Sequence, residues 1–201
     1  MSALVQEIPR LYLDPHSSGV PLTPGEFDAA EFEEGWRYEL IHGVLVVSPY
    51  PLRKERDPNE ELGRWLRNYQ EGHPQGAALD ATFPEETVVT PTERRRADRV
   101  IYAGLGRDPL EGEVPAIVVE FVSAGKRSVI RDYQEKRDEY LAAGVREYWI
   151  IDRFARSLTV HRRHNSDTSQ QVVREGEIYT TPLLPGFELH LANLLERADR
   201  W

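Results

Sequence analysis

One segment, the apolar run VPAIVVEFVS at residues 114–123, constrains the fold of this chain more than any other. Apolar residues on both alternating faces are typical of a central strand that is covered on both sides. A helical pattern follows from about Ser128 to Ala143 and stops at Gly144, and REYWIID at residues 146–152 then has the composition of a second buried strand. This strand–helix–strand order predicts an α/β fold with a mixed sheet.

The segments before this unit predict flanking helices and strands. The capping box of Thr23 and Glu26 predicts a helix that ends at Gly35. The β-rich runs on either side of His42-Gly43 predict a hairpin with a tight turn. A second capping box, Asp57-Pro58-Asn59-Glu60, predicts the start of another helix. Its core-facing stripe consists of Leu62, Trp65, Leu66 and Tyr69.

Shorter strands complete the expected domain. They lie at residues 78–83, 86–90 and 97–103, and again in LTVHRR, QVVREG, EIYT and FELHL. A last short helix is expected near Leu191–Arg197. At 201 residues the chain suits a single domain, 1–201. We expect residues 1–21 to form an N-terminal extension and residues 153–201 to pack on the core as strands and a short helix.

Composition excludes several classes of protein. The absence of cysteine excludes disulfides, thiolate zinc sites and cysteine catalysis. No apolar stretch approaches the roughly 20 residues of a membrane span, and residues 1–15 do not resemble a signal peptide, so a cytoplasmic location is the default expectation. A net charge of −9 argues against a protein that coats nucleic acid without specificity.

Basic residues are nevertheless clustered near two acidic residues, Asp98 and Glu120. Either cluster could be an ordinary solvated face, or it could hold phosphates. The candidates for nucleic-acid contacts are Arg95, Arg96 and Arg99 in one cluster and Lys126, Arg127 and Arg131 in the other.

Glu120 interrupts the apolar strand. An unpaired carboxylate in a buried strand costs several kcal/mol, so it requires a cation, a basic partner or a proton. One interpretation is a structural ion pair or an opening of the sheet to water. The other is a metal ligand or a catalytic acid.

Three further charged residues fall in apolar patterns. Asp98 shares a strand face with Val100 and Tyr102, although it could simply be a strand-start residue. Lys136 lies on the helical stripe that also holds Tyr133 and Tyr140, where it could extend to solvent or pair with Asp132. Because this helix follows directly from the strand of Glu120, its inward face can also lie near that carboxylate. The last of the three is Glu39, a candidate site residue that could instead form a surface pair with Arg37.

Two carboxylates and a lysine suit one chemistry well. Magnesium prefers oxygen ligands and often takes only one or two protein carboxylates, which leaves positions for water and a substrate phosphate. The ion activates water and stabilises charge on the phosphoryl group, and a nearby ammonium adds electrostatic stabilisation. The residues therefore suggest a magnesium-dependent phosphodiesterase.

The chain also resembles a known family, the Uma-two restriction endonucleases, which are a branch of the PD-(D/E)XK nuclease superfamily. The matching pieces run from about Leu22 to Glu196 and include YELIHGVLVVSP, ADRVIY, PAIVVEFVS and RDYQEKRDEYLAAGVREYWIID. The resemblance implies a restriction-endonuclease-like core, in which a mixed sheet is flanked by helices. Two departures are Ala97 where the family usually has proline, and the lack of a histidine in RKERDPNEE.

The resemblance also implies roles for individual residues. Asp98 takes the place of the first acid of the superfamily, and Glu120 that of the second. Val122 stands where the usual motif has lysine; in this family the lysine comes from the next helix, and Lys136 is the matching residue. Glu39 matches the acid of the family's hairpin, and the backbone carbonyl of Phe121 would be a further metal ligand.

These observations predict a DNA endonuclease in which Mg²⁺ is held by Asp98 and Glu120 and Lys136 assists the attacking water. Manganese is expected to substitute for magnesium. DNA is favoured over RNA as the substrate, and no membrane partner is expected. A homodimer is the expected assembly, because many nucleases of this fold pair to cut both strands. The alternatives are a catalytically inactive binding protein of the same fold, which the acidic balance favours, and an RNA-directed nuclease.

Overall fold

The computed structural model describes residues 10–125, 130–164 and 167–201. It confirms an α/β fold with a large mixed sheet flanked by helices. The chain divides into two compact units, the first containing residues 10–50 and Pro91–Arg95 and the second Pro51–Thr90 and Arg96–Trp201. Among the described residues, no helix has both the length and the apolar character that crossing a membrane would require.

The N-terminal unit contains short elements. They are β1 (Tyr12–Leu13), η1 (Pro15–Ser17), α1 (Pro24–Ala29), β2 (Glu31–Phe32), β3 (Arg37–Ile41) and β4 (Val44–Ser48). The predicted capping box forms, with Glu26 N–H donating to Thr23 Oγ1 at 3.2 Å and Thr23 N–H donating to Glu26 Oε2 at 2.8 Å. However, the helix ends at Ala29 rather than Gly35. The reason is that Ala30 is extended and Glu31–Phe32 pairs in parallel with β1.

The predicted hairpin of β3 and β4 is confirmed. His42 and Gly43 have φ values of 50° and 74°, the two positive angles that a tight type I′ turn requires. Within the same unit, Leu40 of β3 pairs with Arg94, the first residue of β6 (Arg94–Ala103).

The second unit is built on a mixed sheet with the strand order β10-β9-β8-β7-β6, and β5 pairs with β6. Strands β7 and β8 are parallel, as the strand–helix–strand pattern predicts, whereas the β6/β7, β8/β9 and β9/β10 pairs are antiparallel. The strands are β5 (Leu79–Val89), β6 (Arg94–Ala103), β7 (Ile117–Phe121), β8 (Glu147–Asp152), β9 (Ser157–His164) and β10 (Asp167–Arg174). A separate antiparallel pair follows, β11 (Ile178–Thr181) and β12 (Leu184–His190).

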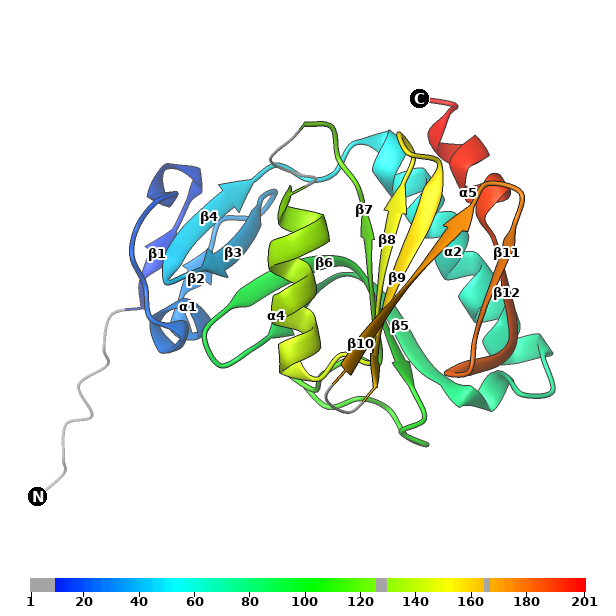
Figure 1. Ribbon diagram of the computed structural model, residues 1–201. Helices are drawn as coiled ribbons and strands as arrows, with labels where there is room; N and C mark the ends of the chain where they lie inside the picture. The colour runs from blue at the N-terminus through cyan, green and yellow to red at the C-terminus, as the bar shows by residue number, and fades with distance from the viewer. Residues whose placement is uncertain (1–9, 126–129, 165–166) are drawn as a thin grey trace, which may run out of the picture. The chain divides into compact units, whose positions relative to one another are not determined.

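Helices cover both faces of this sheet (Figure 1). They are α2 (Arg53–Gly72), the 3₁₀ turn η2 (Gly76–Ala78), the π-helical turn η3 (Arg131–Glu135), α4 (Lys136–Ala143) and α5 (Leu191–Ala198). Helix α2 begins at Arg53, before the predicted box at Asp57, because the Glu55 carboxylate already accepts the Leu52 N–H at 2.8 Å. Its predicted stripe is confirmed, since Leu62, Leu66 and Tyr69 are buried and Trp65 packs against them.

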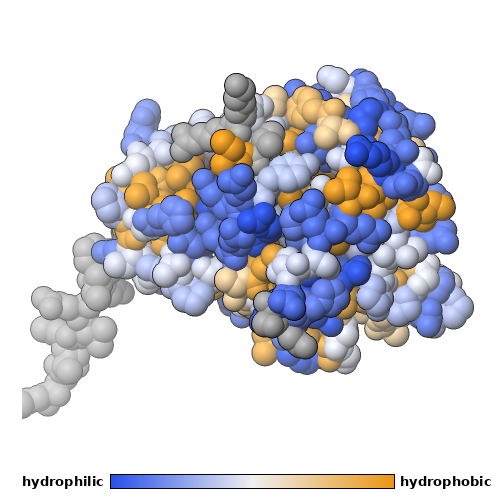
Figure 2. Space-filling model, in the orientation of Figure 1, coloured by the Kyte–Doolittle hydropathy of each residue, from blue (hydrophilic) through white to orange (hydrophobic). Residues whose placement is uncertain are grey.

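The strands alternate between two apolar clusters. Val119 and Phe121 belong to the cluster under α2 and α5, and Val118 and Val122 belong to the cluster under α4. By alternation, Glu120 points to the α4 face. On the outer surface over α4 and β10, hydrophilic side chains predominate (Figure 2), as expected for a helix that buries only its inner face.

Candidate active site

Glu120 is buried on the α4 face of the sheet, near the carboxyl end of β7. Strands pair with β7 on both sides of this residue. On β8 its partner is Ile150, and on β6 Arg99 pairs with the preceding residue, Val119. Only 2% of Glu120 is exposed. Burial raises the pKa of its carboxyl group to about 8, and the opposite pull of Lys136 is too weak to cancel this effect. The charged form of this carboxylate therefore gains strongly from any additional cation.

Lys136 supplies the first cation. Its Nζ lies 2.8 Å from Glu120 Oε1 and donates to the carbonyl of Arg96 at 3.3 Å. Side-chain exposure is 3% for both members of the pair, so the lysine does not extend to solvent. Lys136 is the first residue of α4 and directly follows the π turn η3, a type of irregularity that is frequent at functional sites.

Asp98 joins the site from β6. Since Arg99 pairs with Val119 in an antiparallel ladder, the next position places Asp98 opposite Glu120. By alternation Asp98 lies on the strand face of Val100 and Tyr102, which belong to the cluster under α4. Its Oδ2 accepts the backbone N–H of Phe121 at 2.7 Å, which ties the carboxylate to the strand of Glu120. Asp98, Glu120 and Lys136 are therefore brought together, and all three belong to the second unit.

The donor set of this site fits a hard divalent cation. Both hydrogen bonds that Glu120 accepts, from Lys136 and from Tyr140 OH at 3.1 Å, reach Oε1. In the described part of the chain, Oε2 accepts none. The carboxylate of Asp98, which the Phe121 N–H holds, is a further oxygen donor beside it. Oxygen atoms of this kind are the ligands that Mg²⁺ prefers.

Sequence reasoning missed two residues of this environment. Tyr140 lies on the predicted helical stripe and is not among the predicted site residues, yet its hydroxyl donates to Glu120. Its position one turn after Lys136, on the same stripe, is the available signal. Asn59 of α2 donates to the Asp98 carbonyl at 2.7 Å and accepts Arg99 Nε at 2.7 Å. No local pattern marks Asn59, because its partners lie on another element.

The structure corrects the expected phosphate-binding set. Arg99 is buried and donates to Asn59 and Thr82, and burial lowers its pKa to about 10. Arg95 is also buried, with 0% exposure. Neither side chain faces solvent, so neither is in a position to receive a phosphate.

The other members of that set differ among themselves. Arg96 lies 3.9 Å from Glu85, and Arg131 pairs with Asp132 at 2.8 Å, with about a third of each arginine side chain exposed. Lys126 and Arg127 lie outside the described residues. Glu39 lies on β3 in the N-terminal unit, opposite Val46, and is buried, which argues against the alternative of a surface pair with Arg37.

Comparison with known proteins decides the family. The model of the Uma2 family, described as "putative restriction endonuclease", matches residues 24–192. The chain belongs to the Uma2 family. The resemblance noted in its sequence is thus confirmed, and membership makes the chain part of a nuclease family whose substrates are nucleic acids. No curated protein matches the chain.

A solved structure supports the same architecture for this Uma2 member. The structure is described as that of a "putative nuclease belonging to DUF820" from Anabaena variabilis ATCC 29413. It is similar with a TM-score of 0.69 and 16% sequence identity, over 89% of this chain and 99% of that one. At this identity the likeness establishes the fold, which is the restriction-endonuclease-like fold that the sequence predicts.

Proposed function

We propose that this Uma2 protein is a metal-dependent endonuclease that hydrolyses phosphodiester bonds of DNA. The observation that carries the proposal is the buried pair of Glu120 and Lys136 beside Asp98. The expected ligands of Mg²⁺ are Asp98, Glu120 and the carbonyl of Phe121, and Mn²⁺ is expected to substitute. The bound ion would lower the pKa of a coordinated water and offset negative charge on the phosphate.

The residues of the chain have separable parts in this proposal. The Phe121 N–H holds Asp98 Oδ2, and Lys136 and Tyr140 hold Glu120 Oε1, so both carboxylates are fixed before any ligand arrives. Such preorganisation removes the cost of arranging charged groups during the reaction. The Lys136 ammonium would orient the attacking water and stabilise the charge that develops on the phosphoryl oxygens.

Other parts of the expected machinery stay predictions. Glu39 is expected to assist the metal or the lysine, and Arg96 and Arg131 are expected to contact the nucleic-acid backbone. A homodimer would allow both strands of a duplex to be cut. Substitution of Glu39 by glutamine, followed by measurement of Mn²⁺ affinity, tests the first of these.

The proposal is tested with the full chain and three substrates. Supercoiled plasmid, single-stranded DNA and single-stranded RNA of the same sequence are incubated with Mg²⁺, Mn²⁺ or a chelator. We expect nicked and then linear plasmid with either metal and intact plasmid in chelator. Cleavage that persists in chelator would contradict a metal site. Cleavage of RNA alone would replace DNA as the substrate, and no cleavage of any substrate would reject an active nuclease.

A further inference from the structure

A small hollow lies at the carboxyl ends of β7 and β8, on the face of the sheet that α2 and α5 cover, whereas Glu120 points to the other face. Its lining includes Lys54 and Glu55 of α2, Phe121 and Val122 of β7 and its following residue, and Arg153 after β8. Its volume of about 10 Å³ holds roughly one water molecule. A ligand of any size would therefore lie at its rim, against the side chains of Lys54 and Arg153.

The rim and the candidate active site share one edge of the sheet. Phe121 follows Glu120 directly, and its N–H is the donor to Asp98. Val122 N–H donates to the carbonyl of Ile151 at 2.9 Å, and Arg153 follows two residues later. Because β7 and β8 are parallel, their carboxyl ends lie side by side. This is the edge at which ligands bind in open α/β sheets.

Two cations, Lys54 and Arg153, and one acid, Glu55, line the hollow. Arg53 and Arg56 are exposed near Lys54 on the first turns of α2. The neighbouring acids are engaged in local structure. Glu55 accepts the Leu52 N–H, and Asp152 Oδ1 accepts the N–H groups of Phe154 and Ala155 at 2.8 and 2.9 Å.

Arg153 has the features of a residue held ready for a ligand. Its guanidinium carbon lies 4.2 Å from the ring centroid of Phe154, which is 56% exposed. Its Nε is buried, and within the described residues it donates to no acceptor. A buried donor without an acceptor is unfavourable, so an anion at this position would relieve the cost. The two bonds to Asp152 fix the turn that carries both side chains.

We propose that Lys54 and Arg153 bind a phosphate of the substrate strand next to the phosphate that is cut. The proposal rests on the proposed function for its ligand, a nucleic acid, and it supplies the backbone contacts that the buried Arg95 and Arg99 do not. Lysine and arginine are the usual phosphate contacts of such proteins, and these contacts fix register rather than sequence. The exposed Phe154 ring lies beside them, where a neighbouring base could stack.

The test separates binding from cleavage. Fluorescence anisotropy in chelator measures the affinity for labelled single-stranded and duplex DNA and for RNA, at several salt concentrations. We expect Lys54→Gln and Arg153→Gln each to weaken binding roughly 10-fold, the value of one charged hydrogen bond. Each should also lower the slope of log affinity against log salt by about 0.7 for single strands or 0.9 for duplex.

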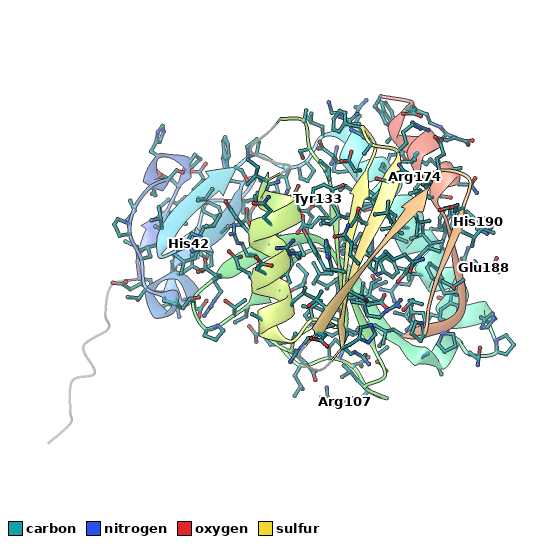
Figure 3. All side chains as sticks on the ribbon, viewed as in Figure 1. His42, Arg107, Tyr133, Arg174, Glu188 and His190 are labelled. Atoms are coloured by element: carbon teal, nitrogen blue, oxygen red, sulfur yellow. The ribbon has the colours of Figure 1, made fainter. Side chains whose placement is uncertain are left out.

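A matched variant controls for net charge. Arg107→Gln removes an exposed arginine that pairs with Glu113, and its binding should be unchanged. Arg174 pairs with Ser157, beside the β8–β9 turn that carries Arg153. Arg107 lies at the other end of the sheet from Arg174 (Figure 3), and therefore away from that turn. Thermal unfolding and Mn²⁺ affinity of all three variants should match the unmodified chain, which excludes misfolding as the cause.

The possible results distinguish the two proposals. If both rim variants bind like the unmodified chain, or if Arg107→Gln weakens binding equally, the phosphate site is rejected even where cleavage depends on Glu120. If the rim variants lose affinity while no substrate is cut and no metal binds, the phosphate site stands and the nuclease proposal fails. Absence of any nucleic-acid binding by the unmodified chain would overturn the inference.

Discussion

Substitution of Glu120 by glutamine is expected to lower metal-dependent cleavage roughly 1,000-fold, because a metal ion contributes several kcal/mol of transition-state stabilisation and each ~1.4 kcal/mol is tenfold in rate. Glutamine keeps the size of the side chain but removes the charge that would hold the cation. Single-turnover cleavage of plasmid and Mn²⁺ titration by calorimetry measure the two losses. Cleavage within tenfold of the unmodified rate would show that the chemistry takes place elsewhere.

A second variant shows whether the buried pair serves function or stability. Lys136→Met alone leaves buried Glu120 without its ion-pair partner at 2.8 Å, and is expected to cost about 3–5 kcal/mol in the free energy of unfolding. Combining it with Glu120→Gln should recover much of that loss, since both charges are then absent. The double variant should nevertheless remain inactive. If it is less stable than Lys136→Met, the pair is retained mainly for stability.

Substitution of Glu147 is expected to destabilise the fold as strongly as Lys136→Met. Glu147 is fully buried at the start of β8, and its Oε1 accepts from Arg162 Nε at 2.7 Å and Thr181 Oγ1 at 2.8 Å. Its Oε2 accepts from Trp149 Nε1 and Tyr179 OH, both at 2.9 Å. Glu147→Ala leaves these donors without their acceptor and removes the buried acid of an ion pair with the partly exposed Arg162. We expect a loss of about 3–5 kcal/mol in the free energy of unfolding, measured by urea denaturation.

An exposed glutamate on a neighbouring element provides the control for Glu147. Glu188 lies on β12 (Figure 3) with 58% of its side chain exposed, 3.5 Å from His190. Glu188→Ala should change the free energy of unfolding by less than about 0.5 kcal/mol. Equal effects of the two substitutions would mean that the Glu147 network adds nothing beyond an ordinary surface contact.

The residues of the candidate site could be selected from the sequence because each breaks an apolar pattern. Glu120 interrupts a buried strand, and Lys136 interrupts the inward stripe of the following helix. The helix returns along the sheet from that strand, so the sequence also predicts that the two can meet. The choice between Asp132 and Glu120 as the partner of Lys136 could not be made, because it depends on the π turn before Lys136 and on how the helix is rotated about its axis.

Other features depend on contacts between distant segments. Glu147 lies near the start of a predicted strand without breaking any pattern, and its partners Arg162, Tyr179 and Thr181 come from later strands. The sequence predicts the start of α2 too late, because the Asp57-Pro58 signature is strong locally whereas the actual cap uses Leu52 and Glu55. Arg99 belongs to a basic cluster in the sequence, but alternation along β6 directs it inward to Asn59. Clustering along the chain does not reveal which side chains face solvent.

The most direct test of the account is the position of a bound cation. A crystal of the full chain soaked in Mn²⁺ and measured at the manganese absorption edge locates the ion by its anomalous signal. We predict a peak within coordination distance of the carboxylates of Asp98 and Glu120 and of the carbonyl of Phe121. A peak elsewhere, or none at this site at saturating Mn²⁺, would contradict the claim that a divalent cation is what these buried charges are arranged to hold.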